Sequence, residues 1–165
     1  MEIRTQVLSQ ISANETEIVS EIVRQSFKKQ AELLELSEET YPNYVAFEKP
    51  QAVAKAMQNG ELIYILKEKK KPVGTIRFKV EKIFFKGSIS RLAVLPEHRK
   101  QGYGKMLMDF AENELKKQGV HQVETSIVKR FEGLQAFYQS LGYSVTKDST
   151  YPSLPFEVRH MEKTL

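Results

Sequence analysis

The sequence contains no cysteine and no apolar run that approaches the roughly 20 residues needed to cross a membrane. Without cysteine, the chain cannot form disulfide bonds, thiolate metal sites or a cysteine nucleophile. Residues 1–4 lack the apolar core of a signal peptide. Internal repeats, low-complexity tracts and linkers are also missing. We therefore expect a cytoplasmic protein that has no membrane partner.

The composition is that of an ordinary globular protein, with 41% hydrophobic and 28% charged residues. A chain of 165 residues fits a single domain, which we expect to span residues 1–165. The net charge of +4 and the isoelectric point of about 9.1 favour anionic partners. Charge alone does not separate nucleic acid from a phosphorylated cofactor. Because aromatic-rich RNA motifs and a helix-turn-helix pattern are absent, we expect no nucleic-acid partner.

The first third of the chain has helical patterns. Asn14 with Glu17 predicts a capping box, and apolar residues then follow helical spacing over 18–27. A polar, irregular stretch covers 37–43. A second helix is predicted over 50–58, where the Asn-Gly pair that follows ends it.

Strands come next. Residues 62–67 form a continuous apolar run of strand length, and a turn is predicted at 70–72. Apolar and polar residues alternate over 76–80, as in a strand with one buried face. Another turn at 86–87 precedes a strand over 88–95 that Pro ends.

The C-terminal half alternates between strand and helix patterns. The clearest helix covers 103–118, with Glu112 on its polar face and Gly119 as its stop. Helices first, then strands, then alternating elements predict an α+β or mixed α/β domain. The further elements expected are a strand over 120–128, a helix over 132–141, and strands over 143–146 and 156–161.

The segment from Val94 to Lys105 predicts an anion site. A strand ends, a turn with Gly102 and Gly104 follows, and a helix begins. The first turn of a helix has N–H groups without intrahelical acceptors and a partial positive charge. Cations there oppose the helix dipole unless an anion binds between them. The glycine spacing fits neither a Walker loop nor a Rossmann fingerprint. The cations in question are Arg99, Lys100 and Lys105.

The strand before this turn changes phase. By strict alternation Ile89 shares a face with Arg91 and Ala93, whereas Leu92 and Val94 carry the apolar pattern. A slip of one residue is what a β-bulge produces, and it would leave backbone groups available to a ligand. A strand buried on both faces would give the same pattern, so both interpretations stand.

Two motifs in this order resemble those of the GCN5-related N-acetyltransferase (GNAT) superfamily. The first is Arg99-x-x-Gly102-x-Gly104. The second is the segment Leu134–Tyr143, which resembles the later helix of the family. The resemblance is close over roughly 62–143. It implies an α/β (α+β) fold with a mixed, mostly antiparallel central sheet flanked by helices, and a β-bulged strand before the acetyl-CoA-binding turn.

The resemblance also implies a site for acetyl-CoA as co-substrate. Tyr138 matches the tyrosine that lies near the CoA sulfur and acts as general acid, although a core aromatic is the alternative. The backbone of the strand would pair with the pantetheine arm, and that of the turn would hold the pyrophosphate. The cofactor-binding residues so implied are Leu92, Ala93 and Val94 on the strand, and Arg99, Lys100, Gln101, Gly102, Tyr103, Gly104 and Lys105 in the turn.

The chain departs from the family pattern at two positions. Phe131 stands where many members have an asparagine, and Arg91 stands where many have a glutamate on the bulged strand. The general base is therefore not identified. Glu124 is a candidate for it, with a surface strand residue as the alternative. Arg91 either faces an acidic group of the substrate or is solvated. No metal site is expected, because the histidines His98, His121 and His160 lack ligand spacing.

The predicted function is an N-acetyltransferase that moves an acetyl group from acetyl-CoA directly to a primary amine of a small molecule or peptide. The alternative is a non-catalytic module that binds acetyl-CoA or CoA. Residues 35–47 and 148–157 are the expected walls of the acceptor pocket. The sequence leaves the oligomeric state undetermined, with a homodimer as one option.

Overall fold

A computed structural model describes residues 5–165, so the predicted absence of a signal peptide at 1–4 lies outside the described residues. Contacts divide the chain into two compact units, which are described separately. Of the described residues, unit 1 comprises 5–78 and 91–111, and unit 2 comprises 79–90 and 112–165. Among the described residues, no helix has the length and apolar character required to span a membrane.

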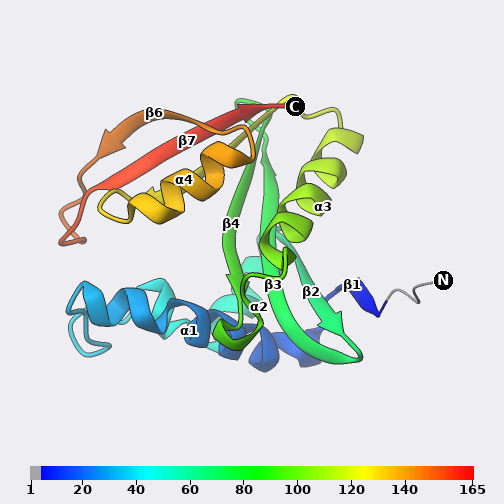
Figure 1. The fold of residues 1–165 in the computed structure, drawn as a ribbon, viewed down its shortest axis with the longest axis horizontal. Coiled ribbons are helices and arrows are strands. Elements are labelled where there is room, and N and C mark those ends of the chain that lie inside the picture. Colours follow the sequence, from blue (N-terminus) through cyan, green and yellow to red (C-terminus); the bar gives the residue numbers. More distant parts are fainter. Residues whose placement is uncertain (1–4) are drawn as a thin grey trace. The chain divides into compact units, whose positions relative to one another are not determined.

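Figure 1 shows the helices and strands along the chain. They are β1 (Gln6–Gln10), η1 (Ala13–Glu15), α1 (Thr16–Leu33), η2 (Val45–Phe47), α2 (Pro50–Gln58), β2 (Leu62–Glu68), β3 (Lys71–Glu81), β4 (Lys86–Val94), η3 (Pro96–His98), α3 (Tyr103–Lys117), β5 (Gln122–Val128), α4 (Glu132–Ser140), β6 (Ser144–Ser149) and β7 (Val158–Thr164).

The seven strands form a sheet in the order β1-β2-β3-β4-β5-β7-β6. β1 pairs with β2, β2 with β3, and β7 with both β5 and β6, all antiparallel. β4 and β5 are parallel, with Gly87 opposite Val123 and Ser88 opposite Glu124. The predicted mixed, mostly antiparallel sheet with helices is confirmed. The prediction that helices come first was wrong, because the short strand β1 precedes them.

Unit 1 begins with a capping box two residues earlier than predicted. Ser12, not Asn14, is the N-cap, and its N–H donates to the Glu15 carboxylate at 3.0 Å. The cap starts the 3₁₀ turn η1, which continues into α1. α2 has the predicted bounds, because Pro50 suits the first helical position and Gly60 adopts the left-handed conformation after the end (φ 84°).

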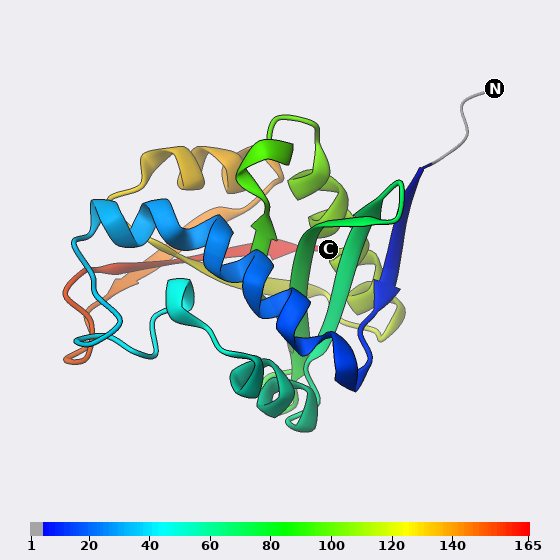
Figure 2. The ribbon, with the colours of Figure 1, turned by 90° about the horizontal axis from the view of Figure 1, so that it is seen from below.

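One face of β2 packs against α1 and α2 to form the core of unit 1, seen from below in Figure 2. Residues 73–78 of β3 are buried throughout, so the prediction of one buried face was wrong there. The core cluster contains Ile11, Val19, Ile22, Val23, Val53, Ala56, Ile63, Ile65, Ala93 and Leu95.

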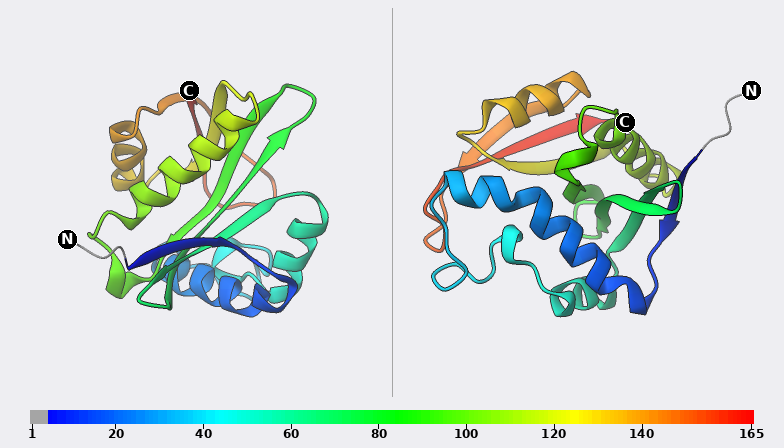
Figure 3. Two further views of the ribbon diagram at one scale, coloured as in Figure 1. Left: turned by 90° about the vertical axis from the view of Figure 1, so that its right-hand side faces the viewer. Right: turned by 60° about the horizontal axis from the view of Figure 1, so that its bottom comes forward.

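The other face of β2 and β3 packs against the first turns of α3, which Figure 3 shows on the side opposite α1 and α2. The Tyr64 and Phe78 rings stack at 5.8 Å, and Phe110 of α3 contacts Tyr64 edge-on at 4.6 Å. Gly74 permits the close approach. A Cβ there would lie 3.0 Å from the Ala93 carbonyl oxygen and 3.1 Å from Leu107.

Two turns lie elsewhere than predicted. Lys69 and Lys70 form the β2–β3 turn with left-handed φ values of 48° and 69°, one residue before the predicted position. Residues 82–85 form the β3–β4 turn, so the pair at 86–87 belongs to β4. Without a glycine in either turn, the sequence lacked the signal that marks such conformations.

Unit 2 is built on the antiparallel strands β5, β7 and β6, along which α4 lies (Figure 1). Val123, Thr125 and Ile127 alternate as the buried residues of β5. Gly87 of β4 lies close to this unit's core, since a Cβ there would lie 2.7 Å from Leu115.

We expect Gly74→Ala to lower the free energy of unfolding by about 1–3 kcal/mol, because the added methyl group meets a backbone oxygen that cannot move aside. Gly133→Ala is the matched control. Gly133 is helical and a Cβ there meets no atom within 4 Å, so alanine should leave stability unchanged or raise it slightly. Urea denaturation of both variants measures this. Equal stability of Gly74→Ala and wild type would contradict the close packing.

Candidate functional site

The turn between η3 and α3 contains two left-handed residues. Lys100 has φ 64° and Gly102 has φ 81°. A Cβ on Gly102 would meet no atom within 4 Å, so protein does not fill the space beside it. The Met106 N–H already donates to the Gly102 carbonyl at 3.0 Å. The N–H groups that precede it have no acceptor within the helix, as an anion site at a helix start requires.

The three cations predicted at this turn have different surroundings. Arg99 donates to the Ser26 carbonyl of α1 at 2.7 Å. Lys105 pairs with Asp109 at 2.7 Å, one turn along α3. Lys100 is exposed and makes no ion pair with any residue in 5–165. It is therefore the cation of the three whose charge is not engaged within the described chain.

Several side chains of this segment contact other parts of the protein and not open space. Tyr103 is 5% exposed and donates to Glu68 at 3.0 Å. Ala93 belongs to the core cluster, and Val94 packs near Gly74. Leu92 is half-buried, while Gln101 is exposed.

β4 leaves the extended conformation at Arg91, where φ is 50°. Left-handed backbone costs a non-glycine residue roughly 1–2 kcal/mol and is rare inside a strand. This is the position at which the phase of the sequence pattern predicted a bulge. Beyond it, Ala93 shares the α1 face with Ile63, and Val94 faces α3 with Gly74.

Arg91 belongs to a buried group that sequence reasoning did not find. The Arg77 guanidinium donates to both oxygens of Glu48, at 2.9 and 3.0 Å, and the Arg91 Nε donates to the same carboxylate at 3.3 Å. The side chains of Glu48 and Arg77 are 3% and 4% exposed. The Glu48 carbonyl accepts from Arg24 of α1 at 2.8 Å. We call Glu48, Arg77 and Arg91 the Glu48 cluster.

In unit 2, Tyr138 lies in a buried aromatic group on α4. It is 7% exposed, and its ring lies 5.1 Å from Phe137 and 5.7 Å from Tyr143. Burial raises the pKa of Tyr138 to about 12, although a hydrogen bond with Thr125 acts in the opposite direction. The phenol is therefore protonated at neutral pH.

Tyr143 connects this group to a buried carboxylate. Gly142 is left-handed (φ 98°) and ends α4, and the Tyr143 N–H then donates to the Tyr138 carbonyl at 3.0 Å. The Tyr143 hydroxyl donates to Glu112 at 2.8 Å, and Lys163 donates to the other oxygen at 2.6 Å. Glu112 is 7% exposed, so its prediction on the polar face of the helix was wrong.

Glu124 is the candidate general base, and Phe131 is one of the two residues that depart from the family pattern. Glu124 is half-buried on β5, opposite Ser88 and Glu162 in the ladder, and alternation places it on the other face from Thr125. Phe131 is the N-cap residue of α4. Within residues 5–165, no three acidic or histidine side chains gather as metal ligands.

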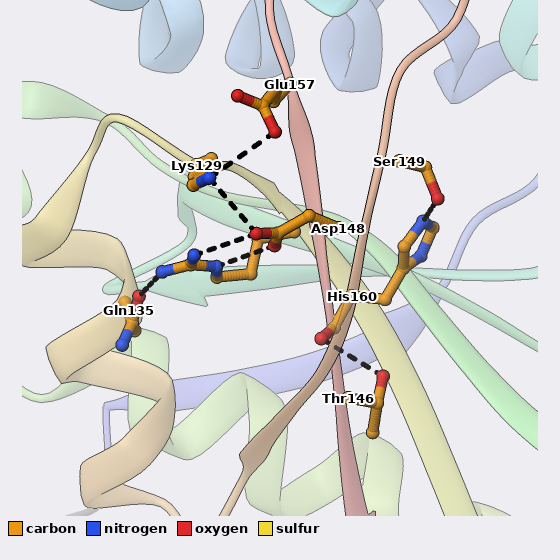
Figure 4. A network of polar contacts seen from close by, with 8 residues as sticks. Lys129, Gln135, Thr146, Asp148, Ser149, Glu157 and His160 are labelled. Carbon is orange, nitrogen blue, oxygen red and sulfur yellow. Dashed lines mark hydrogen bonds and ion pairs between the residues drawn. The ribbon is translucent and has the colours of Figure 1, made fainter.

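The predicted wall 148–157 is held by ion pairs, drawn in Figure 4. Asp148 accepts from Arg159 at 2.8 and 3.0 Å, and these bonds hold the pKa of that carboxyl well below its usual range. Lys129 bridges Asp148 and Glu157 at 3.2 and 3.4 Å. The His160 ring lies 3.0 Å from the Ser149 hydroxyl.

The predicted wall 35–47 is only partly aromatic at its surface. Tyr44 is 8% exposed, packs edge-on against Phe47 at 6.1 Å, and donates to Gln30 at 3.3 Å. Burial raises the pKa of Tyr44 to about 12. These two side chains therefore anchor the loop to α1, while Tyr41 stays half-buried.

Comparison with known protein families shows which family this chain belongs to. The model of the acetyltransferase (GNAT) domain matches residues 13–165, nearly the whole chain. The chain belongs to the GNAT family. The predicted family is confirmed, and with it the enzyme class, that of acetyl-CoA-dependent N-acetyltransferases.

The sequence match to an individual relative covers less of the chain than the match to the family. A protein of Bacillus subtilis (strain 168) with a provisional acetyltransferase name is 31% identical over 77 residues, which cover 47% of this chain. The match spans 49% of that relative's own length. Sequence similarity to this relative therefore covers about half of each protein.

Solved GNAT structures match over the full fold. The PaiA N-acetyltransferase of Thermoplasma acidophilum, in complex with coenzyme A, has a TM-score of 0.80 at 21% identity and covers 98% of this chain and 100% of its own. The ribosomal-protein-S18-alanine N-acetyltransferase of Escherichia coli has a TM-score of 0.75 at 15% identity, over 96% and 93%. YncA of Salmonella typhimurium, with acetyl-CoA, has a TM-score of 0.70 at 17% identity, over 98% and 95%.

In this GNAT chain, the structure brings the predicted cofactor-binding residues together in unit 1, along the end of β4 and the start of α3. Tyr138 and Glu124 belong to unit 2. Glu48 was missed because it lies 29 residues before Arg77 in an irregular segment, and only the buried pair identifies it. An Arg in place of a strand glutamate was the signal that could have prompted the search.

We expect the stability of this GNAT chain to fall between pH 10 and 12. Below about pH 10 the tyrosines stay protonated in both states, but above it the unfolded chain loses protons that buried Tyr138 and Tyr44 retain up to about 12. Each should remove about 1.4 kcal/mol per pH unit. Tyr138→Phe should make this slope shallower by about 1.4 kcal/mol per pH unit, measured by urea denaturation at pH 9, 10 and 11. A slope equal to that of wild type would refute the buried phenol.

Proposed function

We propose that this protein transfers an acetyl group from acetyl-CoA directly to a primary amine of a small molecule or peptide. The observation that carries the proposal is the turn before α3, where left-handed Lys100 and Gly102 leave N–H groups and an exposed cation around space that protein does not fill. Such a group suits a pyrophosphate. The family match over residues 13–165 supports one catalytic domain over 1–165.

The proposed contacts to acetyl-CoA are mostly backbone contacts. The N–H groups from Arg99 to Lys105 would hold the pyrophosphate, and the backbone of Leu92 to Val94 would pair with the pantetheine arm. The Val94 N–H is our candidate to stabilise charge on the thioester oxygen. Acetyl-CoA supplies the activated acyl group. The chain has no cysteine, so an acyl-cysteine intermediate is impossible, which is consistent with the proposed direct transfer to the amine.

We propose that Tyr138 acts on the leaving sulfur by hydrogen bonding more than by full proton transfer. A thiol has a pKa of about 8.5, so transfer from a phenol whose pKa is about 12 is unfavourable by roughly 5 kcal/mol. A hydrogen bond from that phenol still stabilises developing thiolate charge. The contribution should therefore fall at the low end of the range for acid catalysis.

Amine acceptors among the structural neighbours support the reaction class. One neighbour is named as the ribosomal-protein-S18-alanine N-acetyltransferase, and another is a spermidine N-acetyltransferase chimera from Vibrio cholerae and hSSAT. Their identities of 15% and 11% are too low to transfer either acceptor to this chain. A panel that includes amino acids, polyamines and peptides is therefore the starting screen.

We expect acetyl-CoA to bind wild type saturably in a calorimetric titration and Gly102→Glu to abolish the binding. The glutamate adds a negative charge and a side chain where the pyrophosphate would lie. Gly60→Glu is the matched control, because Gly60 has the same left-handed backbone (φ 84°) and also meets no atom within 4 Å. Absence of binding to wild type, or equal loss in the two variants, would overturn the cofactor site.

We expect Tyr138→Phe to lower kcat by about 10- to 100-fold with little change in the KM for acetyl-CoA. The phenylalanine keeps the packing but removes the hydroxyl. Tyr143→Phe is the control within the same aromatic group, and it should lower stability while keeping kcat within a few fold. Thiol release with the amine panel measures both. Unchanged kcat in Tyr138→Phe would remove the catalytic role, and no transfer by wild type would leave a CoA-binding module.

A further inference from the structure

The Glu48 cluster has one more positive charge than negative. Arg77 donates to both oxygens of Glu48, and these two side chains form a neutral, buried pair. Arg91 adds a second guanidinium to the same carboxylate, and its side chain is 37% exposed. The pair is complete without Arg91, so the charge of Arg91 is in excess at a half-exposed position.

The guanidinium of Arg91 is held by one bond. Its Nε donates to Glu48 Oε1 at 3.3 Å, and within residues 5–165 Glu48 is its hydrogen-bond and ion-pair partner. The two terminal nitrogens therefore have no acceptor in the described chain. A guanidinium anchored through Nε presents these nitrogens as a planar fork, which matches a carboxylate through two parallel hydrogen bonds. The Glu48 anchor fixes the orientation of that fork before a ligand arrives.

The backbone of Arg91 is strained at the same place. Its φ of 50° lies in the left-handed region, which is rare for a non-glycine residue within a strand. Strained non-glycine residues concentrate at ligand-binding positions because the surrounding structure must hold them. The side chain emerges on the Glu48 face of β4, immediately before the segment proposed to pair with the pantetheine arm.

We propose that Arg91 binds a carboxylate of the acceptor, and that the acceptor is a small amine that carries this carboxylate, the class that includes amino acids. The inference rests on the proposed acetyl transfer. Arg91 precedes Val94 by three residues, or roughly 10 Å along a strand. Part of that span is filled by the arginine side chain and the thioester, so the amine and the carboxylate must lie within one small molecule.

The test compares amino acids with their own carboxamides, which keep the amine and remove the negative charge. For each pair that the wild type acetylates, kcat/KM should be at least tenfold higher for the amino acid than for its carboxamide. Arg91→Gln should abolish this preference, mainly through KM, and leave the carboxamide within about threefold. Arg91→Lys should restore part of it, since the charge remains without the fork. Lys116→Gln, which removes an exposed cation from α3, should keep the preference.

A binding measurement separates this inference from the proposed reaction. CoA-saturated protein is titrated with N-acetyl amino acids and with their carboxamides, so no turnover is needed. Tighter binding of the carboxylates, lost in Arg91→Gln while acetyl-CoA affinity stays unchanged, supports the site even where no amine is acetylated. The inference would be overturned if carboxylates and carboxamides bound equally well, or if Arg91→Gln lowered the affinity for both equally. Tighter binding of phosphoethanolamine than of every carboxylate would also overturn it.

Discussion

The buried pair of Glu48 and Arg77 is the interaction on which the site in unit 1 depends. Two charges removed from water lose several kcal/mol of solvation each, and only well-formed hydrogen bonds offset that loss. Here two bonds of 2.9 and 3.0 Å join the carboxylate to β3, and Arg24 joins the Glu48 carbonyl to α1. The irregular segment before α2 is thereby fixed to the sheet. Without that anchor nothing would hold the Arg91 side chain beside the bulged strand.

The turn before α3 shows a second constraint, the placement of cations near a helix N-terminus. Three cations there would oppose the helix dipole, yet two of them are compensated within the chain, Arg99 by the Ser26 carbonyl and Lys105 by Asp109. Lys100 is left to act on an incoming anion. Lys100 and Gly102 are both left-handed, and turns with left-handed residues can form the backbone N–H nests that bind phosphate. In the proposed site, folding and anion binding would therefore use different cations of the same motif.

Local signals in the sequence predicted local structure well. Pro50 and Gly60 set the bounds of α2, and the glycine motif located the start of α3, because both depend on backbone conformation within a few residues. Contacts across long separations were missed. Glu112 has a polar sequence context, but Lys163, 51 residues later, allows its burial. Glu48 meets Arg77 in the same way, so the most informative group of the candidate site had no pattern in one sequence.

The family pattern led us to expect a glutamate at the position of Arg91, and an arginine there would change how the amine loses its proton. A strand glutamate would accept that proton, whereas a guanidinium cannot accept it and acts only through its positive charge. The carboxylate of an amino acid stabilises the ammonium beside it and keeps the amine protonated. Once Arg91 neutralises that carboxylate, the pKa of the amine should fall toward the value of about 7.7–8.0 that is typical of a peptide N-terminus. Roughly a tenth to a sixth of the amine is then neutral at pH 7, having lost its proton to water, and can react. Recognition of the acceptor and activation of its amine would thus come from one side chain.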